Sequence, residues 1–311
     1  MFVGGFEAYP RISYPLHARY TSIRQSERHG HGEPAMALEF TLHTDGAHFL
    51  GVAEPYLFRN EAENSLTLGV AATLASNSSP DHLWVTVAYK GEVIATAFHT
   101  PPYNVVLTGD SDEAVDLMAR RMHNAGTTPP GVLGPSRLAS RFATNWAELT
   151  GGTIGRGMAQ RIYRLEKVMP PASTAGELRP AVSDDLDLLA SWLDAFIEET
   201  GIPNPSTGRQ MAGSGIDEKR IFVWDNGGPV STALWNRPTQ TGVTINAVYT
   251  PGNERSRGYA SACVAALSQR MLDEGHAFCC LYTDLSNRIA NDIYMSIGYK
   301  PVCDVDEYLF S

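Results

Sequence analysis

Two arginines and a glycine at the start of a predicted helix form the pattern in this sequence with the clearest chemistry. Arg255, Arg257 and Gly258 follow an apolar, β-branched run and precede a segment whose apolar residues fall at helical spacing. The first turn of a helix leaves backbone N–H groups unpaired and carries partial positive charge. A glycine there lets phosphate oxygens approach the backbone, and arginines add charge-assisted hydrogen bonds. The stretch therefore predicts a helix N-terminus that phosphate oxygens can approach.

A second set of polar residues follows the next predicted strand. The segment from Ala277 to Thr283 is a continuous apolar run, as expected for a strand buried on both faces. A predicted helix from Asp284 to Gly298 then carries Asn287 and Tyr294. A tyrosine can supply a proton to a leaving group, although it can also be a core residue beside Ile293 and Ile297. Asn287 can orient a ligand or cap its own helix.

Each of these two patterns resembles a motif of the GNAT superfamily of acyl-coenzyme A N-acyltransferases. The motif that grips the pyrophosphate of acetyl-coenzyme A is (Gln/Arg)-x-x-Gly-x-(Gly/Ala), and the second is Asn-x-x-Ala-x-x-x-Tyr-x-x-x-Gly-(Phe/Tyr). The corresponding residues are Arg255, Gly258 and Ala260, then Asn287, Ala290, Tyr294, Gly298 and Tyr299. Both occur in the expected order, and the pair is far more specific than either motif alone. The strong resemblance covers roughly residues 220 to 305.

The resemblance implies an acetyl-coenzyme A fold and transfer of the acetyl group to an amine. Exposed backbone groups of Val248 and Tyr249 would pair with the pantetheine arm, as an added strand does. The N–H near Val248 would stabilise the tetrahedral oxyanion. The pyrophosphate would be held by Arg255, Arg257 and the main-chain amides from Ser256 to Ala260, Tyr259 included. Tyr294 would be the general acid. No metal ion is expected.

The general base is less clear from the sequence. Asp284 ends the strand that would line the cleft, and Glu198 or Glu199 ends the helix expected over the acceptor site. Each carboxylate can instead be a solvated or capping group, and a water relay is a further alternative. Of these groups, Asp284 and Glu199 are the candidate catalytic carboxylates.

The elements that would position these residues recur twice along the chain. Both halves show the order hairpin, break, strand, helix, short strand, helix and closing strands. We therefore expect an α/β (α+β) protein of two tandem lobes, each a mixed, mostly antiparallel sheet flanked by helices. In the first half the closing segment, Thr153 to Val168, reads as two strands.

Domain boundaries follow from composition. Residues 1–35 show no convincing periodicity and are predicted to be a disordered extension whose deletion leaves folding and activity unchanged. The first lobe is expected over residues 36–169 and the second, acetyltransferase-like lobe over residues 177–311. Between them, Pro170 to Gly176 has the composition of a linker.

The first lobe is expected to be a degenerate copy that binds no cofactor. Its segment from Thr108 to Asp116 reaches a helix through four carboxylates, and no arginine is expected to offset them. These charges would repel a pyrophosphate. The same acidic residues favour a helix N-terminus, so the lobe is interpreted as structural or substrate-shaping.

Composition excludes several classes of function. The chain has 311 residues, 43% hydrophobic and 19% charged, and a formal net charge of −10. A negative surface argues against nucleic acid and anionic membranes and is compatible with an amine substrate. No apolar run approaches the roughly 20 residues of a membrane helix. The cysteines lack a Cys-x-x-Cys spacing, which favours reduced thiols and a cytoplasmic location.

Two other functions compete with N-acetyl transfer. A non-catalytic acyl-coenzyme A sensor or interaction module would keep the cofactor site without turnover, and Tyr294→Phe would separate the two. A nucleotide-dependent oxidoreductase is disfavoured because the sequence lacks Gly-x-Gly-x-x-Gly with an acidic residue about 20 positions later. The acceptor could be a small amine, an aminoacyl compound or a protein amine, and a homodimer is left open.

Overall fold

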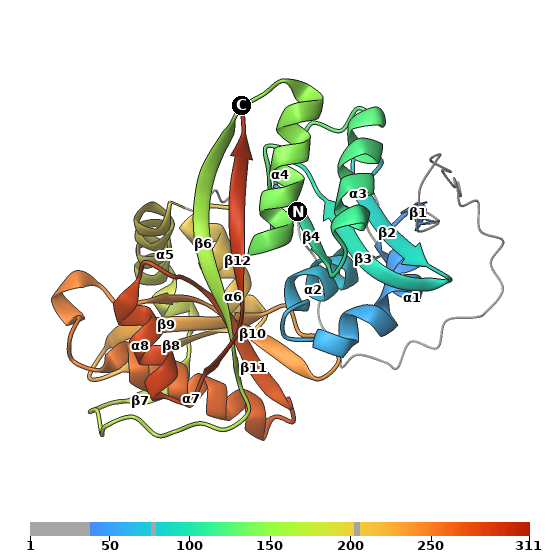
Figure 1. Cartoon of the computed structure of the whole chain (residues 1–311). Coiled ribbons are helices and arrows are strands. Elements are labelled where there is room, and N and C mark those ends of the chain that lie inside the picture. Colours follow the sequence, from blue (N-terminus) through green and yellow to red (C-terminus); the bar gives the residue numbers. More distant parts are fainter. Residues whose placement is uncertain (1–37, 76–78, 202–205) are drawn as a thin grey trace, which may run out of the picture. The chain divides into compact units, whose positions relative to one another are not determined.

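The computed structural model describes residues 38–75, 79–201 and 206–311 (Figure 1). Its contacts divide the chain into two compact units. We call them the N-terminal unit, with residues 38–162, 284–286 and 302–311, and the C-terminal unit, with residues 163–283 and 287–301. The extension predicted for residues 1–35 lies outside the described residues, and the lobe boundaries predicted around residues 170–176 stay a prediction.

The N-terminal unit is built on strands in the order β1-β2-β3-β4-β5-β12. Neighbouring strands in this order are antiparallel except β4 and β5, which are parallel. The strands are β1 (Leu38–His43), β2 (Leu83–Tyr89), β3 (Glu92–His99), β4 (Val105–Gly109), β5 (Gly131–Pro135), β6 (Ile154–Leu165) and β12 (Lys300–Phe310). The helices are α1 (Gly46–Leu57), η1 (Phe58–Asn60), α2 (Ser65–Leu74), α3 (Asp112–Asn124) and α4 (Ser136–Thr150).

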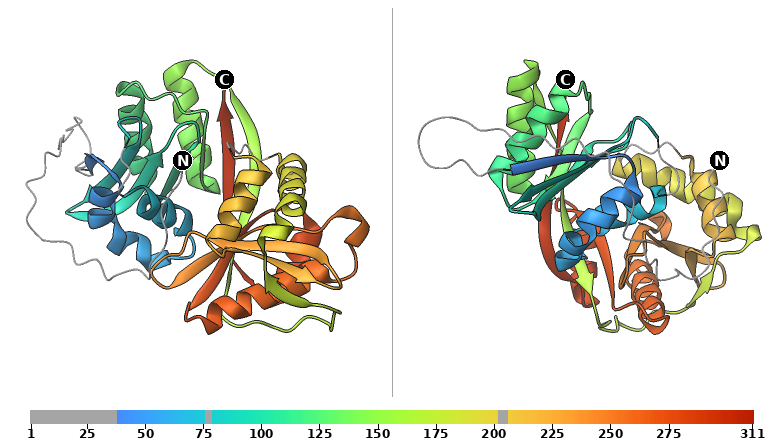
Figure 2. Two further views of the ribbon diagram at one scale, coloured as in Figure 1. Left: turned by 180° about the vertical axis from the view of Figure 1, so that it is seen from behind. Right: turned by 90° about the vertical axis from the view of Figure 1, so that its right-hand side faces the viewer.

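Alternation along β2 and β3 explains how this sheet is covered on both faces. Val85, Val87 and Ala97 join a cluster with α3 and α4, whereas Trp84 and Phe98 join a second cluster with α1 and α2. Successive side chains of a strand point to opposite faces, so both sets can be buried at once. Figure 2 shows α1 and α3 on opposite sides of these strands.

The C-terminal unit carries strands in the order β6-β11-β10-β9-β8-β7. The strands are β7 (Glu177–Pro180), β8 (Ile221–Asp225), β9 (Pro229–Asn236), β10 (Gly242–Tyr249) and β11 (Phe278–Asp284). The helices are η2 (Ser183–Asp185), α5 (Leu186–Thr200), α6 (Gly208–Asp217), η3 (Gly252–Glu254), α7 (Tyr259–Asp273) and α8 (Arg288–Ser296). Strands β10 and β11 are parallel, and the three neighbouring pairs from β7 to β10 are antiparallel.

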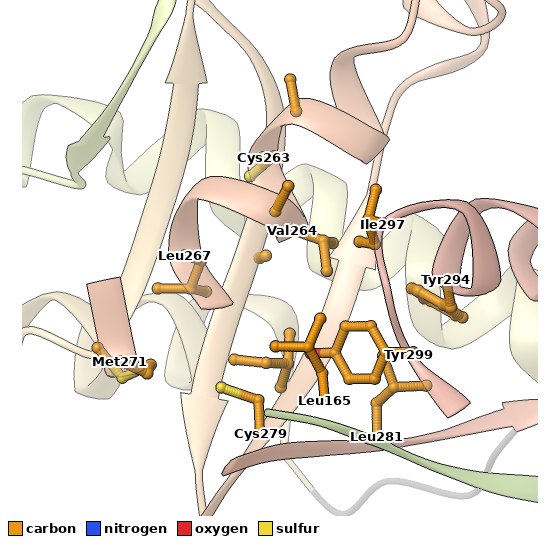
Figure 3. Close-up of a cluster of buried hydrophobic side chains, with 14 of the residues drawn as sticks. Leu165, Cys263, Val264, Leu267, Met271, Cys279, Leu281, Tyr294, Ile297 and Tyr299 are labelled. Carbon is orange, nitrogen blue, oxygen red and sulfur yellow. The ribbon is translucent and has the colours of Figure 1, made fainter. Parts of the chain in front are cut away.

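Two hydrophobic clusters cover the two faces of this second sheet. Helices α5 and α6 bury Leu189, Leu193 and Ala212 against one face. Helices α7 and α8 bury a larger set against the other, and Figure 3 shows part of it, with Leu165 of β6 inside the cluster. Burial of such side chains stabilises by about 1.5–3 kcal/mol each, so this cluster fixes the position of α7 and its N-terminus.

The two halves of the chain follow one order of elements. From β1 to β6, and again from β7 to β12, the order is strand, two helices, three strands, helix, strand, helix, strand. The closing strand of each half lies next to a strand of the other half. Residues Val305–Leu309 of β12 pair with β5 of the first half, and β6 lies next to β11 of the second.

This structure confirms the predicted fold class, and two local expectations fail. The closing segment of the first half is one strand, β6, because Gly155 and Gly157 continue it without a turn. Gly157 also sits where a Cβ would meet the Glu307 carboxylate at 2.3 Å. Helix α6 was not expected, although Thr207 and Gln210 form a capping box at its start.

Candidate active site

A β-bulge interrupts β10 near its end. Asn246 pairs with Leu234 and Tyr249 with Thr232, so two residues of β10 oppose a single residue of β9. Ala247 has φ +45°, and its N–H donates to the Asn246 side chain at 2.7 Å. The bulge takes Val248 out of the regular register with β9. This places the main-chain groups predicted to meet the thioester in an irregular stretch of strand.

Strands β10 and β11 share only a short ladder at their first residues. Their parallel register runs from Gly242 and Phe278 to Thr244 and Cys280, while the strands continue to Tyr249 and Asp284. Beyond the last pair, the facing backbone groups of Ile245 and later residues are outside this ladder. The two strands therefore share ladder hydrogen bonds only near their first residues.

The loop between β10 and α7 turns through two left-handed residues. Ser256 has φ +62° and Gly258 has φ +82°, and Gly258 is the N-cap residue of α7. Because glycine has no side chain, it brings no capping oxygen to the first-turn amides, and that turn contains no acidic residue. The amides of Tyr259 and Ala260 therefore begin the helix without a side-chain cap from Gly258, as an anion site requires.

The segment predicted as a linker contacts this loop. The Thr174 hydroxyl lies 2.9 Å from the position that a Cβ on Gly258 would occupy. The same hydroxyl donates to the Ala172 carbonyl at 3.2 Å. Thr174 therefore limits the space beside Gly258. No local pattern predicts this contact, because the two residues are far apart in the chain.

Arg255 contacts the residue that follows β10 and a residue near the end of α5. Its Nε donates to the Thr250 carbonyl at 2.8 Å, and one terminal nitrogen donates to both oxygens of Glu199 at 2.8 Å. The guanidinium carbon lies 5.7 Å from the centre of the Tyr249 ring. The hydrogen bond that Arg255 donates to Glu199, together with the negative charge of Glu199, holds the pKa of Arg255 above its usual value. The structure thus brings together two predicted residues, Arg255 and Glu199, in one ion pair.

Arg257 has a local carboxylate partner. Its guanidinium donates to Glu254 of η3 at 2.9 Å, and the Arg257 side chain is exposed. An ion pair of this kind contributes about 0.2–1 kcal/mol. Arg257 can therefore readily exchange Glu254 for a more strongly charged anion.

Tyr294 lies on α8 at the edge of the cluster drawn in Figure 3. Its ring is 6.4 Å from Tyr163 and 6.0 Å from Tyr299, and 9% of the residue is exposed. Burial raises the pKa of Tyr294 to about 12, so the phenol is protonated at neutral pH. It can donate a hydrogen bond and cannot act as a base there.

The motif residue Asn287 caps α8. Its side-chain oxygen accepts from the Ala290 N–H at 3.1 Å, and its carbonyl accepts from the Asn291 amide at 2.8 Å. Asn291 in turn accepts from the Tyr163 hydroxyl at 2.8 Å. Of the two roles considered for Asn287, the structure shows the cap.

Asp284 closes a local turn at the end of β11. Its two oxygens accept from the Ser286 N–H and hydroxyl, each at 2.7 Å. By its contacts Asp284 belongs to the N-terminal unit, whereas Tyr294 and Glu199 belong to the C-terminal unit. Its proposed part in catalysis stays a prediction.

The equivalent position in the first half is closed. Asp110 and Ser111 alone separate β4 from α3, whereas residues 250–258 separate β10 from α7. The Ser111 hydroxyl accepts from the Ala114 N–H and so caps α3. The short connection leaves no loop that could surround a diphosphate.

The acidic residues at α3 have arginine partners, contrary to the expectation from sequence. Arg137 pairs with Asp112, and Arg141 pairs with Asp116 through two contacts of 2.6 Å. Both arginines come from α4, so their approach depends on packing that no local pattern indicates. The pKa of Asp116 is lowered, because the hydrogen bonds from Arg141 and Asn145 outweigh the opposing effect of burial.

Among residues 38–75, 79–201 and 206–311, no group of three or more His, Cys, Asp or Glu side chains could hold a metal ion. Within the same ranges, no helix has the length and apolar character needed to span a bilayer. Cys263, Cys279, Cys280 and Cys303 are free thiols.

Comparison with known proteins identifies the fold. The family model described as FR47-like protein matches residues 227–309. No curated protein sequence matches this chain. Among solved structures, a GNAT-family acetyltransferase from Colwellia psychrerythraea is 13% identical, with a TM-score of 0.52, over 75% of this chain and 87% of its own.

Two further structures align over nearly their whole length. A Drosophila protein is 12% identical with a TM-score of 0.59, covering 93% of this chain and 98% of its own. A tandem GNAT protein from the clavulanic acid biosynthesis pathway is 10% identical with a TM-score of 0.51, covering 88% and 98%. This chain is therefore a tandem, two-lobe protein of the GNAT fold, with an FR47-like segment in its second half.

Proposed function

We propose that this chain is an N-acetyltransferase that binds acetyl-coenzyme A in its C-terminal unit and transfers the acetyl group to a primary amine. The observation that carries the proposal is the uncapped start of α7, where Ser256 and Gly258 are left-handed and acidic residues are absent from the first turn. This is the kind of helix N-terminus that holds a diphosphate. The fold supports acyl transfer in general.

The proposed placement of the cofactor uses the bulged strand and the loop. The diphosphate accepts hydrogen bonds from amides between Ser256 and Ala260, and the pantetheine arm pairs with β10 near Val248 and Tyr249. Arg255 leaves the exposed Glu199, and Arg257 leaves the partly buried Glu254, to contact the phosphates. Those ion pairs are weak enough to be exchanged, since charge-assisted bonds to a diphosphate contribute about 1.5–3 kcal/mol each.

The proposed chemistry is direct attack. A neutral amine adds to the thioester carbonyl, and the N–H of Val248 stabilises the oxyanion. The C–S bond breaks as the amine loses one proton to a protein carboxylate, and the coenzyme A thiolate takes one proton from water after it leaves, so no net proton is consumed. Binding both reactants next to each other supplies much of the rate.

The raised pKa of Tyr294 refines its proposed role. Complete proton transfer from a phenol of pKa about 12 to a thiolate of pKa about 8.5 costs about 5 kcal/mol. Tyr294 therefore acts by donating a hydrogen bond to the sulfur as negative charge develops there. The group that removes the amine proton is Glu199 in this proposal, once Arg255 has left it.

Calorimetry with coenzyme A, followed by acetylation assays across small amines, aminoacyl compounds and peptides, tests the proposal. We expect one coenzyme A per chain and turnover of at least one amine class. Absence of coenzyme A binding to well-folded protein would refute it.

A non-catalytic acyl-coenzyme A sensor is the second candidate. It is favoured by the engagement of both loop arginines and by the weak acidity of Tyr294. Binding of coenzyme A without turnover of any amine would support the sensor. A cytoplasmic location is also proposed. It agrees with the four cysteines being thiols rather than disulfides.

A further inference from the structure

The guanidinium of Arg255 occupies a cation site that other parts of the C-terminal unit build. Both oxygens of Glu199, at the end of α5, accept from it at 2.8 Å. The Tyr249 ring lies 5.7 Å from its central carbon, within the range of a cation–π contact. A carboxylate and an aromatic face together form a site that would equally suit an alkylammonium group.

Packing on α5 and β10 holds this site in place without Arg255. Trp192 of α5 is buried, and its ring lies 6.3 Å from that of Tyr249. The Tyr249 hydroxyl lies 3.4 Å from Glu199, which joins the ring and the carboxylate directly. Desolvation and the charge of Glu199 raise the pKa of Tyr249, so its ring stays neutral beside the cation.

Under the proposed function, Arg255 has a second anionic partner besides Glu199. This partner is the diphosphate, because Arg255 belongs to the loop that binds it. Its ion pair with Glu199 is about half exposed on both sides. An exposed pair shifts an equilibrium by about 1.4- to 5-fold, whereas charge-assisted bonds to a phosphate shift it about ten-fold or more. The diphosphate is therefore the stronger partner.

We propose that coenzyme A draws Arg255 away from Glu199, and that Glu199 and the Tyr249 ring then bind the ammonium group of the acceptor. The inference rests on the proposed function and adds a coupling between its two substrates. In the free protein Arg255 fills the acceptor site, so a cationic amine binds after coenzyme A. Because such coupling is reciprocal, the amine also strengthens the binding of coenzyme A.

Calorimetric titration of coenzyme A into two matched variants tests whether Arg255 exchanges Glu199 for coenzyme A. Glu199→Gln removes the competitor for Arg255, so we expect coenzyme A to bind about 1.4- to 5-fold more tightly than to the unaltered protein. Glu198→Gln makes the same charge change at the neighbouring, exposed residue of α5 and should leave the affinity unchanged. Equal affinities in the two variants would overturn the exchange.

Titration of 1,4-diaminobutane, with and without saturating coenzyme A, tests the coupling between the two substrates. We expect coenzyme A to tighten binding of the diamine at least about three-fold, and Glu199→Gln to abolish this effect while Glu198→Gln keeps it. The neutral analogue 1,4-butanediol should show no dependence on coenzyme A.

Three results would contradict the inference in distinguishable ways. If coenzyme A binds but the diamine binds equally with and without it, the coupling is wrong and the proposed function stands. The same holds if the butanediol behaves as the diamine does, because the site then recognises no charge. If coenzyme A binds to no variant, the proposed function fails and the inference fails with it.

Discussion

Substituting Gly258 tests the diphosphate site most directly. Gly258 has φ +82°, and an added Cβ would lie 2.9 Å from the Thr174 hydroxyl. A left-handed conformation costs a non-glycine residue about 1–2 kcal/mol, which in a unit of this size lowers the unfolding midpoint by about 2 to 8 °C. The methyl group would also push Thr174 and the first amides of α7 apart.

The effect of Gly258→Ala on coenzyme A should exceed its effect on stability. Losing one charge-assisted bond to the diphosphate weakens binding by about ten- to hundred-fold. Calorimetry measures this affinity, and thermal unfolding measures the strain.

A glycine at the other end of the same helix provides the control. Gly275 has φ +102°, and its added Cβ would meet nothing within 4 Å. Gly275→Ala therefore carries similar strain without a clash and should bind coenzyme A normally. If both variants lose stability alike and both bind coenzyme A as the unaltered protein does, the diphosphate does not approach Gly258 and the reasoning is refuted.

Three other outcomes follow from the C-terminal unit. Tyr294→Phe should lower kcat by about 100-fold while the Kd of coenzyme A changes little, which steady-state kinetics and calorimetry check together; an unchanged kcat would remove Tyr294 from the reaction. Arg179→Met leaves the buried Asp185 carboxylate without its guanidinium and should destabilise by about 3 kcal/mol at pH 7. The hydrogen bond from Arg179 lowers the folded-state pKa of Asp185, so this loss should be full above about pH 4 and shrink as the pH falls below it, in thermal unfolding at a series of pH values. A loss independent of pH would contradict that assignment. Gly208→Ala should destabilise by about 1–3 kcal/mol, because its Cβ would lie 2.2 Å from a backbone oxygen of α5. The Cβ of Gly213→Ala, on the same helix, would meet nothing within 4 Å, so this control should be neutral or slightly stabilising. Equal melting temperatures of the two variants would show that α5 and α6 separate easily.

Local signals in the sequence were sufficient for most elements. The acidic segment from Thr108 to Asp116 predicted a helix N-terminus, and α3 begins there at Asp112. Gly258 was predicted to start α7, and it does so in the left-handed conformation that glycine allows. Such features depend on neighbouring residues, which a pattern can record.

Features that depend on distant residues could not be predicted in this way. The contact of Thr174 with Gly258, the pairs that Arg137 and Arg141 form with α3, and the link between Arg255 and Glu199 all join separate elements. Helix α6 was missed for another reason. Its three glycines lower helix propensity, and the capping box of Thr207 outweighed them only together with packing against α5.

The exchanged closing strands have a consequence for synthesis of the protein. A nascent chain presents the edge of β5 well before residues 302–311 leave the ribosome, and those residues supply its partner β12. Until translation ends, that edge is free to pair with another chain, which is a common route to aggregation. Cutting the gene between the two halves would leave each product with the wrong final strand, so neither half is expected to be a self-sufficient folding unit.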